Sequence, residues 1–136
     1  MDRNVGVWID HKQAYLIWYR EGRVEVIASN LEPPAHFSGG TQLGGRLNQK
    51  GDTELHHNDR YRVQLNKYYK QVVAALKDVE SIFIMGPGNA KIEFEKILKK
   101  HKVMQKRLLK VETADKMTRN QMVARVRRFY KNQATA

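Results

Sequence analysis

Hydrophobic and polar residues alternate along the first part of the chain. Residues 4–10 follow a period of two, residues 14–19 are aromatic and β-branched, and residues 24–29 alternate again. A period of two is typical of a strand with one face buried. The sequence Arg-Glu-Gly-Arg at 20–23 contains the glycine of a hairpin turn. These patterns predict three consecutive strands that form an antiparallel meander.

A long irregular segment separates these strands from the first helical pattern. Residues 30–57 hold two of the three prolines and five of the nine glycines of the chain, and they show no period. We therefore expect a long Gly/Pro-rich loop, which in a compact domain is commonly either functional or disordered. From about Asn58 to Val79 the apolar residues recur at helical spacing, which predicts a helix with its apolar stripe towards the sheet.

The rest of the chain alternates between strand and helix patterns. Residues 81–85 form a short run that is apolar after Ser81, as in a strand buried on both faces. A helical stripe follows at 94–101, and residues 107–115 have a strand pattern. The sequence Thr-Arg-Asn-Gln at 118–121 is a capping box, in which the first and last side chains bond to each other's backbone N–H groups, and it predicts the start of a final helix.

The predicted element order is β-β-β-α-β-α-β-α. An antiparallel meander followed by α/β crossovers gives a mixed five-stranded sheet with flanking helices. With 136 residues the chain is long enough for one such unit. We therefore predict a single α/β domain, residues 1–136, with a ribonuclease H-like arrangement.

Positive charge is concentrated at the C-terminal end. The net charge is +11, yet residues 1–95 hold 12 Lys and Arg against 12 Asp and Glu. Residues 96–136 hold 13 Lys and Arg against only Glu112 and Asp115. Such an asymmetry favours a polyanionic partner, since cations that neutralise phosphates release counterions. The alternative is a basic surface that serves solubility.

Composition argues against several other classes of protein. The chain has no cysteine, and its five histidines lack metal-ligand spacing, so we expect no metal site. No apolar run approaches the roughly 20 residues of a membrane span, and the first residues lack the pattern of a secretory signal. We expect no membrane association and a cytoplasmic location.

Residues 81–98 have the order strand, glycine-rich turn, helix, which can form a phosphate cradle. Gly86, Gly88 and Lys91 do not fit the Walker motif, because Ile92 stands where Ser or Thr would bind magnesium. A dinucleotide fingerprint would need a third glycine where Lys91 stands. We therefore expect no nucleotide cofactor and only a generic anion contact at Lys91.

A nuclease is also disfavoured. Two-metal hydrolysis needs several carboxylates that converge at strand ends. Asp10 ends the first strand, but the fourth strand ends in Met85 and Gly86. We expect Asp10 to be a turn residue.

The sequence Gly-Gly-Thr-Gln in the long loop is a weak candidate for catalysis. The paired glycines Gly39 and Gly40 allow main-chain N–H groups to approach a ligand closely, and the amide of Gln42 can orient water. A flexible glycine-rich loop is the alternative.

Three segments, VWIDHKQAYL (7–16), IFIMGPGNAKIEFEKIL (82–98) and ETADKMTRNQMVARVRRFY (112–130), resemble small bacterial proteins described as release-factor-like translational machinery proteins. The element order resembles the middle domain of archaeo-eukaryotic class-1 peptide release factors and of Pelota. In release factors a Gly-Gly-Gln loop positions water on peptidyl-tRNA. Here Gly39 and Gly40 match that loop, while Thr41 occupies the glutamine position and Gln42 follows.

The resemblance and the charge together suggest three functions. The first is an RNA-binding, ribosome-associated factor whose partner is the ribosome, tRNA or rRNA. The second is codon-independent hydrolysis of peptidyl-tRNA, with Gly39, Gly40 and Gln42 in the working loop. The third is a non-catalytic module that binds an acidic protein. The candidate RNA contacts are cations on the three predicted helices: Lys67, Lys70, Lys91, Lys99, Lys100, Arg119, Arg125 and Arg128.

Overall fold

A mixed five-stranded sheet forms the centre of the protein. The structure is a computed structural model that describes residues 3–31 and 47–135; for residues 47–58 and 134–135 it describes only the backbone. The strand order is β3-β2-β1-β4-β5. β1 pairs antiparallel with β2, and β2 with β3, while β4 runs parallel to both β1 and β5. The strands are β1 (Asn4–Ile9), β2 (Gln13–Trp18), β3 (Val24–Ala28), β4 (Ser81–Gly86) and β5 (Leu108–Thr113).

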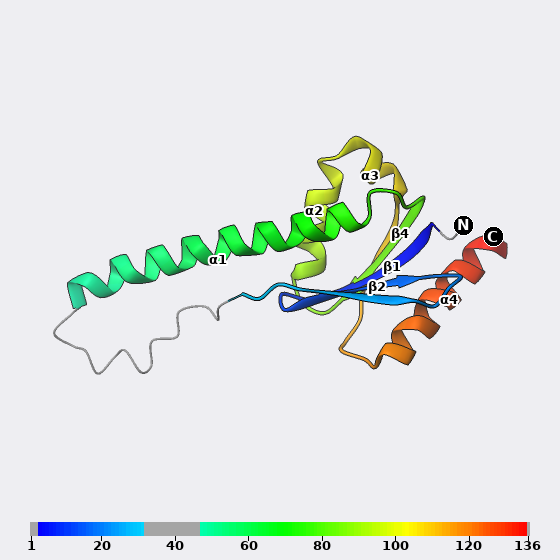
Figure 1. The fold of residues 1–136 in the computed structure, drawn as a ribbon, viewed down its shortest axis with the longest axis horizontal. Coiled ribbons are helices and arrows are strands. Elements are labelled where there is room, and N and C mark those ends of the chain that lie inside the picture. The colour runs from blue at the N-terminus through cyan, green and yellow to red at the C-terminus, as the bar shows by residue number, and fades with distance from the viewer. Residues whose placement is uncertain (1–2, 32–46, 136) are drawn as a thin grey trace.

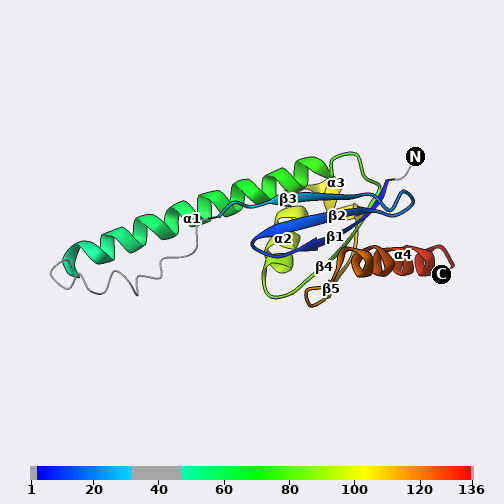
Figure 2. The same ribbon diagram turned by 60° about the horizontal axis from the view of Figure 1, so that its bottom comes forward.

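Helices cover both faces of this sheet (Figures 1 and 2). They are α1 (Leu47–Ala75), α2 (Ala90–Lys99), α3 (Lys102–Arg107) and α4 (Arg119–Thr135). α1, α2 and α3 contribute to the hydrophobic cluster on one face, and α4 contributes to the cluster on the other. The fold class predicted from the sequence is confirmed: this is a single α/β domain with a mixed five-stranded sheet and flanking helices.

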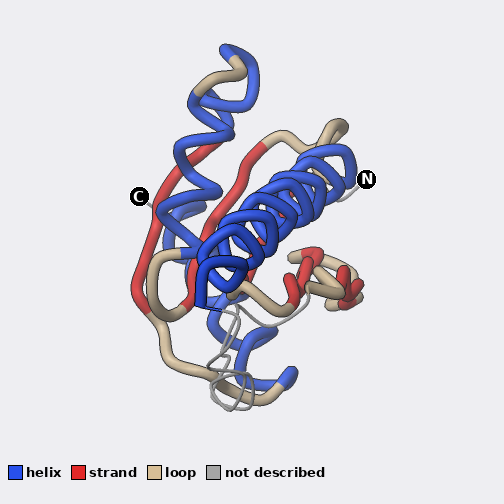
Figure 3. Tube along the Cα trace, turned by 90° about the vertical axis from the view of Figure 1, so that its left-hand side faces the viewer, coloured by secondary structure: helices blue, strands red, loops and turns tan. Residues whose placement is uncertain are grey.

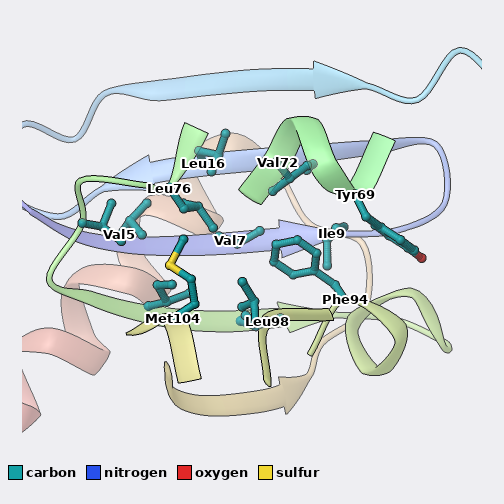
Figure 4. Packing of buried hydrophobic residues seen from close by; sticks show 14 of the residues in the cluster. Val5, Val7, Ile9, Leu16, Tyr69, Val72, Leu76, Phe94, Leu98 and Met104 are labelled. Carbon is teal, nitrogen blue, oxygen red and sulfur yellow. The ribbon is translucent and has the colours of Figure 1, made fainter. Parts of the chain in front are cut away.

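The first face is a large aliphatic and aromatic core (Figure 4). Successive residues of a strand point to opposite faces, so Val5, Val7 and Ile9 of β1 all join this cluster. Tyr69 of α1 and Phe94 of α2 pack together above them, with ring centroids 5.9 Å apart. The helical stripes predicted for these two helices therefore do face the sheet.

The second face is smaller and more aromatic. Trp8 and Phe83 point towards α4, and Phe83 stacks on Phe129 with ring centroids 4.1 Å apart. Gly6 lies under the helix, where a Cβ atom would be 2.2 Å from Cγ2 of Val126. The absence of a side chain at this position lets α4 approach β1 closely.

Two elements differ from the sequence prediction. α1 begins at Leu47, so residues 47–57 belong to a helix and not to the predicted loop. The backbone of the helix projects beyond the sheet there (Figure 1), so this part does not need the apolar stripe of a helix that packs on the core. The structure also adds α3, a six-residue helix with a single buried residue, Met104. So short a segment has no recognisable period.

α1 is much longer than the strands that it covers. Its 29 residues span about 44 Å at the usual helical rise, whereas strands of five or six residues span about 20 Å. Among the side chains of α1 that the structure describes, from Asp59 onwards, the first buried one is Tyr68. The first part of α1 therefore extends away from the body of the protein (Figure 1), and Figure 3 views the molecule from the end at which this helix starts.

Candidate nucleic-acid interface

Four of the predicted RNA contacts lie on the helices of the first face. Lys67 and Lys70 are exposed on α1. Lys99 and Lys100 are exposed at the end of α2, where Lys99 forms an ion pair with Glu95, one helical turn earlier, at 3.0 Å. An exposed pair of this kind holds its partners weakly, so Lys99 remains able to contact a phosphate.

Lys91 does not have the exposed position that the sequence suggested. Only 6% of the residue is exposed, and its Nζ donates a hydrogen bond to the carbonyl oxygen of Gly88 at 2.5 Å. The ammonium group thus closes the turn that precedes α2 instead of pointing out of it. Lys91 therefore supports the turn and is far less exposed than the sequence suggested, although it also lines an open pocket together with Lys99. Its role as a phosphate contact stays a prediction.

α4 carries the other predicted contacts and begins as the sequence predicted. The backbone N–H of Thr118 donates to Oε1 of Gln121 at 2.9 Å, and the N–H of Gln121 donates to Oγ1 of Thr118 at 3.2 Å. The capping box is thereby confirmed. Arg119 and Arg128 are exposed along the helix.

Arg125 has a structural partner on β5. Its Nε and Nη2 donate to the two carboxylate oxygens of Glu112, at 2.8 and 2.5 Å, and its guanidinium lies 5.1 Å from the ring centroid of Phe83. The hydrogen bonds from Arg125 lower the pKa of Glu112 below its usual value. Since this paired guanidinium is occupied in tying α4 to the sheet, Arg125 is a poor candidate for an RNA contact.

The predicted contacts do not share one surface. Lys67, Lys70, Lys99 and Lys100 belong to the layer formed by α1 and α2, whereas Arg119 and Arg128 belong to α4 on the opposite face of the sheet (Figure 2). The sequence pattern suggests a single basic face. The structure instead presents two separate basic surfaces.

The carboxyl end of β1 holds a network of hydrogen bonds around Asp10 and Glu93. Oδ1 of Asp10 accepts hydrogen bonds from the backbone N–H groups of Lys12 and Gln13, both at 2.8 Å. Asp10 is thus a turn residue, as predicted. Nearby, Oε1 of Glu93 accepts a hydrogen bond from the Tyr69 hydroxyl at 2.6 Å and lies 3.0 Å from Nε2 of His11.

The two tyrosines beside this network stay protonated. Burial, and then the negative charge of Asp10, raises the pKa of Tyr68 above its usual value. Burial, followed by the hydrogen bond to Glu93, raises the pKa of Tyr69. Both hydroxyls act as donors: Tyr68 donates to the carbonyl oxygen of Asp10 at 2.9 Å and holds α1 against the end of β1, whereas Tyr69 donates to Glu93 and joins α1 to α2. Across the described residues, no three His, Asp or Glu side chains gather as metal ligands would.

The candidate catalytic residues Gly39, Gly40 and Gln42 lie outside the described residues. Their segment precedes Leu47, the first residue of α1. It is therefore joined to the end of α1 that projects from the domain (Figure 1).

A group of cations that the sequence pattern does not single out surrounds an open pocket beside the end of α4. Arg20, Arg127 and Lys131 are among its lining residues. Arg127 and Lys131 are four residues apart, which places them on one side of a helix. That spacing is visible in the sequence. The proximity of Arg20 to these two residues is not, because it depends on how the strands and α4 pack together.

Comparison with known proteins supports the fold. The sequence matches no protein-family model and no curated protein sequence. The structure is similar to that of an archaeal translation termination factor, aRF1, with a TM-score of 0.51 and 13% sequence identity. The match covers 96% of this chain and 40% of aRF1. At this identity the similarity establishes a release-factor-like fold and nothing further. None of the described helices has the length and apolar character needed to cross a bilayer.

Proposed function

We propose that this protein is an RNA-binding, ribosome-associated translation factor that resembles a stand-alone middle domain of a release factor. The observation that best supports this function is the excess of positive charge at residues 96–136, which the fold distributes over α2, α3, β5 and α4. The similarity to a termination factor favours RNA over other polyanions. The predicted contacts that are exposed in the structure are Lys67, Lys70, Lys99, Lys100, Arg119 and Arg128.

Co-sedimentation with ribosomes over a series of salt concentrations tests this function. Binding should weaken steeply with salt, with a log–log slope of about −0.7 to −0.9 for each phosphate contacted. Arg119→Gln combined with Arg128→Gln should reduce both the affinity and the slope. Binding that is insensitive to salt, or absent at low salt, would contradict the proposal.

A control pair removes the same charge from the neutral part of the chain. Arg3 and Arg23 are exposed, and Arg23 already has ion pairs with Glu21 and Glu25 at 3.0 and 3.5 Å. Arg3→Gln combined with Arg23→Gln should leave ribosome binding nearly unchanged. An equal loss with both pairs would indicate an effect of net charge alone.

A second function, codon-independent release of the peptide from stalled ribosomes, is favoured by the position of Gly39, Gly40 and Gln42 in the sequence, shortly before Leu47, where the projecting helix α1 begins. Gly40→Ala and Gln42→Ala should each reduce the release of peptide from stalled complexes, without loss of co-sedimentation. If the wild type and both variants release peptide equally, or if none of the three does, the release function is wrong and only the ribosome-binding function remains.

The alternative to RNA binding is that the basic surfaces bind an acidic protein. A pull-down from lysate with and without ribonuclease distinguishes the two. Partners should be lost after ribonuclease treatment, because ribosomal RNA is the expected bridge. A single acidic protein that is retained after treatment would favour the protein-binding function.

A further inference from the structure

An open pocket lies where the end of α4 meets the sheet, at the amino-terminal ends of β1 and β4. Its volume is about 680 Å³, within the range of roughly 300–1,000 Å³ that is typical of small-molecule sites. The strands, the hairpin between β2 and β3, and α4 all contribute to its wall. The lining residues are Asn4, Tyr19, Arg20, Ser81, Leu109, Arg127, Tyr130, Lys131 and Gln133.

The fold holds the wall of this pocket in place. The Tyr130 hydroxyl is buried and donates a hydrogen bond to the carbonyl oxygen of Val5 at 2.6 Å, which fixes the end of α4 on β1. The Ser81 hydroxyl donates to Oδ1 of Asn4 at 2.7 Å, across the paired starts of β4 and β1. These hydrogen bonds fix the positions of three residues that line the pocket.

Arg127 has a position that a glycine makes possible. A Cβ atom at Gly22 would lie 2.6 Å from Nη2 of Arg127, so the guanidinium lies directly against the hairpin turn. Gly22 also has a φ of +68°, a conformation that other residues adopt at a cost. The turn thus leaves room for the arginine beside Arg20, the residue that opens the hairpin.

The chemistry of the wall matches a phosphate and an aromatic base. Arg20, Arg127 and Lys131 supply positive charge, and no carboxylate is among the lining residues that the structure describes. The ring of Tyr19 lies 5.3 Å from that of Tyr130 and forms the half-buried aromatic part of the wall. Arginine and lysine bind phosphates, and a tyrosine ring can stack on an unpaired base.

We propose that this pocket binds one nucleotide unit of single-stranded RNA, with its phosphate between Arg127 and Lys131 and its base against Tyr19. Bases in a duplex are stacked on each other and are not available to an aromatic side chain, so the pocket should prefer a single strand. This inference rests on the proposed RNA-binding function and adds to it the kind of RNA and the site that receives it.

The test compares two pairs of substitutions that remove equal charge. Arg127→Gln with Lys131→Gln changes the pocket. Lys102→Gln with Lys106→Gln changes two exposed lysines of α3, which have the same spacing and lie with the opposite layer. Fluorescence anisotropy would measure the affinity of each protein for a short labelled oligouridylate, at several salt concentrations, and for an RNA duplex of equal length.

The pocket pair should reduce the affinity for oligouridylate about tenfold and make the log–log salt slope shallower by about 0.7 for each phosphate that is no longer neutralised. Tyr19→Leu should reduce the affinity for oligouridylate without changing that slope, and should not affect the duplex. Gly22→Ala, which displaces Arg127, should resemble Arg127→Gln, and thermal unfolding would verify that each variant is folded.

Failure of the pocket and failure of RNA binding give different results. If the two pairs of substitutions weaken oligouridylate binding equally, or if Tyr19→Leu weakens duplex binding equally, the pocket proposal is wrong while RNA binding stands. If the wild type binds neither RNA at low salt but still co-sediments with ribosomes, the pocket proposal alone fails. If it binds none of the three, both proposals fail.

Discussion

Gly6 shows how a single position sets the distance between α4 and the sheet. A Cβ atom there would be 2.2 Å from Cγ2 of Val126. Gly6→Ala should therefore reduce the free energy of unfolding by about 1–3 kcal/mol through overpacking. In a Val126→Ala background the same change should cost clearly less, because the two conflicting methyl groups are gone. Urea unfolding of the four proteins measures this coupling.

Gly88 provides the control for that cycle. Its φ is +60°, and a Cβ atom would meet nothing within 4 Å. Gly88→Ala should reduce the free energy of unfolding by about 1–2 kcal/mol through the backbone conformation alone. The reduction should be the same with or without Val126→Ala. Equal costs of Gly6→Ala in both backgrounds would refute the steric explanation.

Glu112 makes the stability of the protein depend on acid pH. Its pKa in the folded protein is lowered from 4.5, first by the hydrogen bonds from Arg125. A carboxyl group whose pKa is lower in the folded protein stabilises the fold at pH values above its pKa in the unfolded chain. This stabilisation is lost as the pH falls through its pKa in the folded protein. Glu112→Gln should therefore destabilise by about 1 kcal/mol at neutral pH, and the difference from wild type should shrink below about pH 4.5.

Unfolding in urea at several pH values would test this dependence. Glu25→Gln is a suitable control, because Glu25 is exposed on β3 and its pair with Arg23 is longer, at 3.5 Å. It should show little effect at any pH. A difference between Glu112→Gln and wild type that persists at low pH would mean that the ion pair is not its source.

Among the elements, α1 has two parts with different roles. The described residues from Asp59 to Gln64 are exposed or half-buried, and Val63 is 64% exposed, whereas Tyr68, Val72 and Leu76 are in the core. Only the second part should contribute to the cooperative stability of the domain.

Glycine substitutions in the two parts of α1 test this division. Gln71→Gly should reduce the free energy of unfolding by about 1 kcal/mol, the intrinsic cost of glycine in a helix. Arg62→Gly should leave it unchanged within error and reduce only the far-UV helical signal. Both residues are exposed, and the fluorescence of buried Trp8 reports on the domain. Equal losses of stability would mean that the projecting part unfolds together with the core.

The elements also show which sequence signals carry structural information. The three central strands β1, β2 and β4 were predictable because they bury residues at a period of two or as a continuous run, whereas the edge strands β3 and β5 contain only exposed and half-buried residues and were predictable from their sequence patterns. The capping box at Thr118 predicted the start of α4 to within one residue. The first part of α1 was not predictable, because it projects beyond the sheet and contains Gly51, an unfavourable helix residue. α3 buries only Met104 and gives no periodic signal.

At the scale of the whole molecule, the sheet order follows from the sequence more readily than the site does. A meander followed by crossover connections leaves few topologies. The grouping of cations depends instead on which face each helix covers, and on partners such as Glu112 for Arg125 and Gly88 for Lys91. No period in the sequence reveals these partners, so residues that seemed equivalent in it have different roles in the structure.

The two basic surfaces lead to a prediction about large and small RNA. A ribosome is large enough to contact both faces of the sheet, whereas a short oligonucleotide is not. Lys99→Gln with Lys100→Gln on α2, and Arg119→Gln with Arg128→Gln on α4, should each make the salt slope of ribosome binding shallower by about 0.9 for every phosphate that is no longer neutralised.

The effects of the two pairs on ribosome binding should add in the quadruple variant, because the sites lie on opposite faces and share no partner. On a short RNA duplex, which the pocket at Tyr19 should not take up, loss of one pair should leave binding through the other surface, so the quadruple variant should lose far more affinity than either pair alone. Co-sedimentation and anisotropy on the same four proteins measure the two cases. If one pair accounts for the whole loss of ribosome binding, a single basic surface is sufficient. The prediction that the ribosome contacts both faces of the sheet is then wrong.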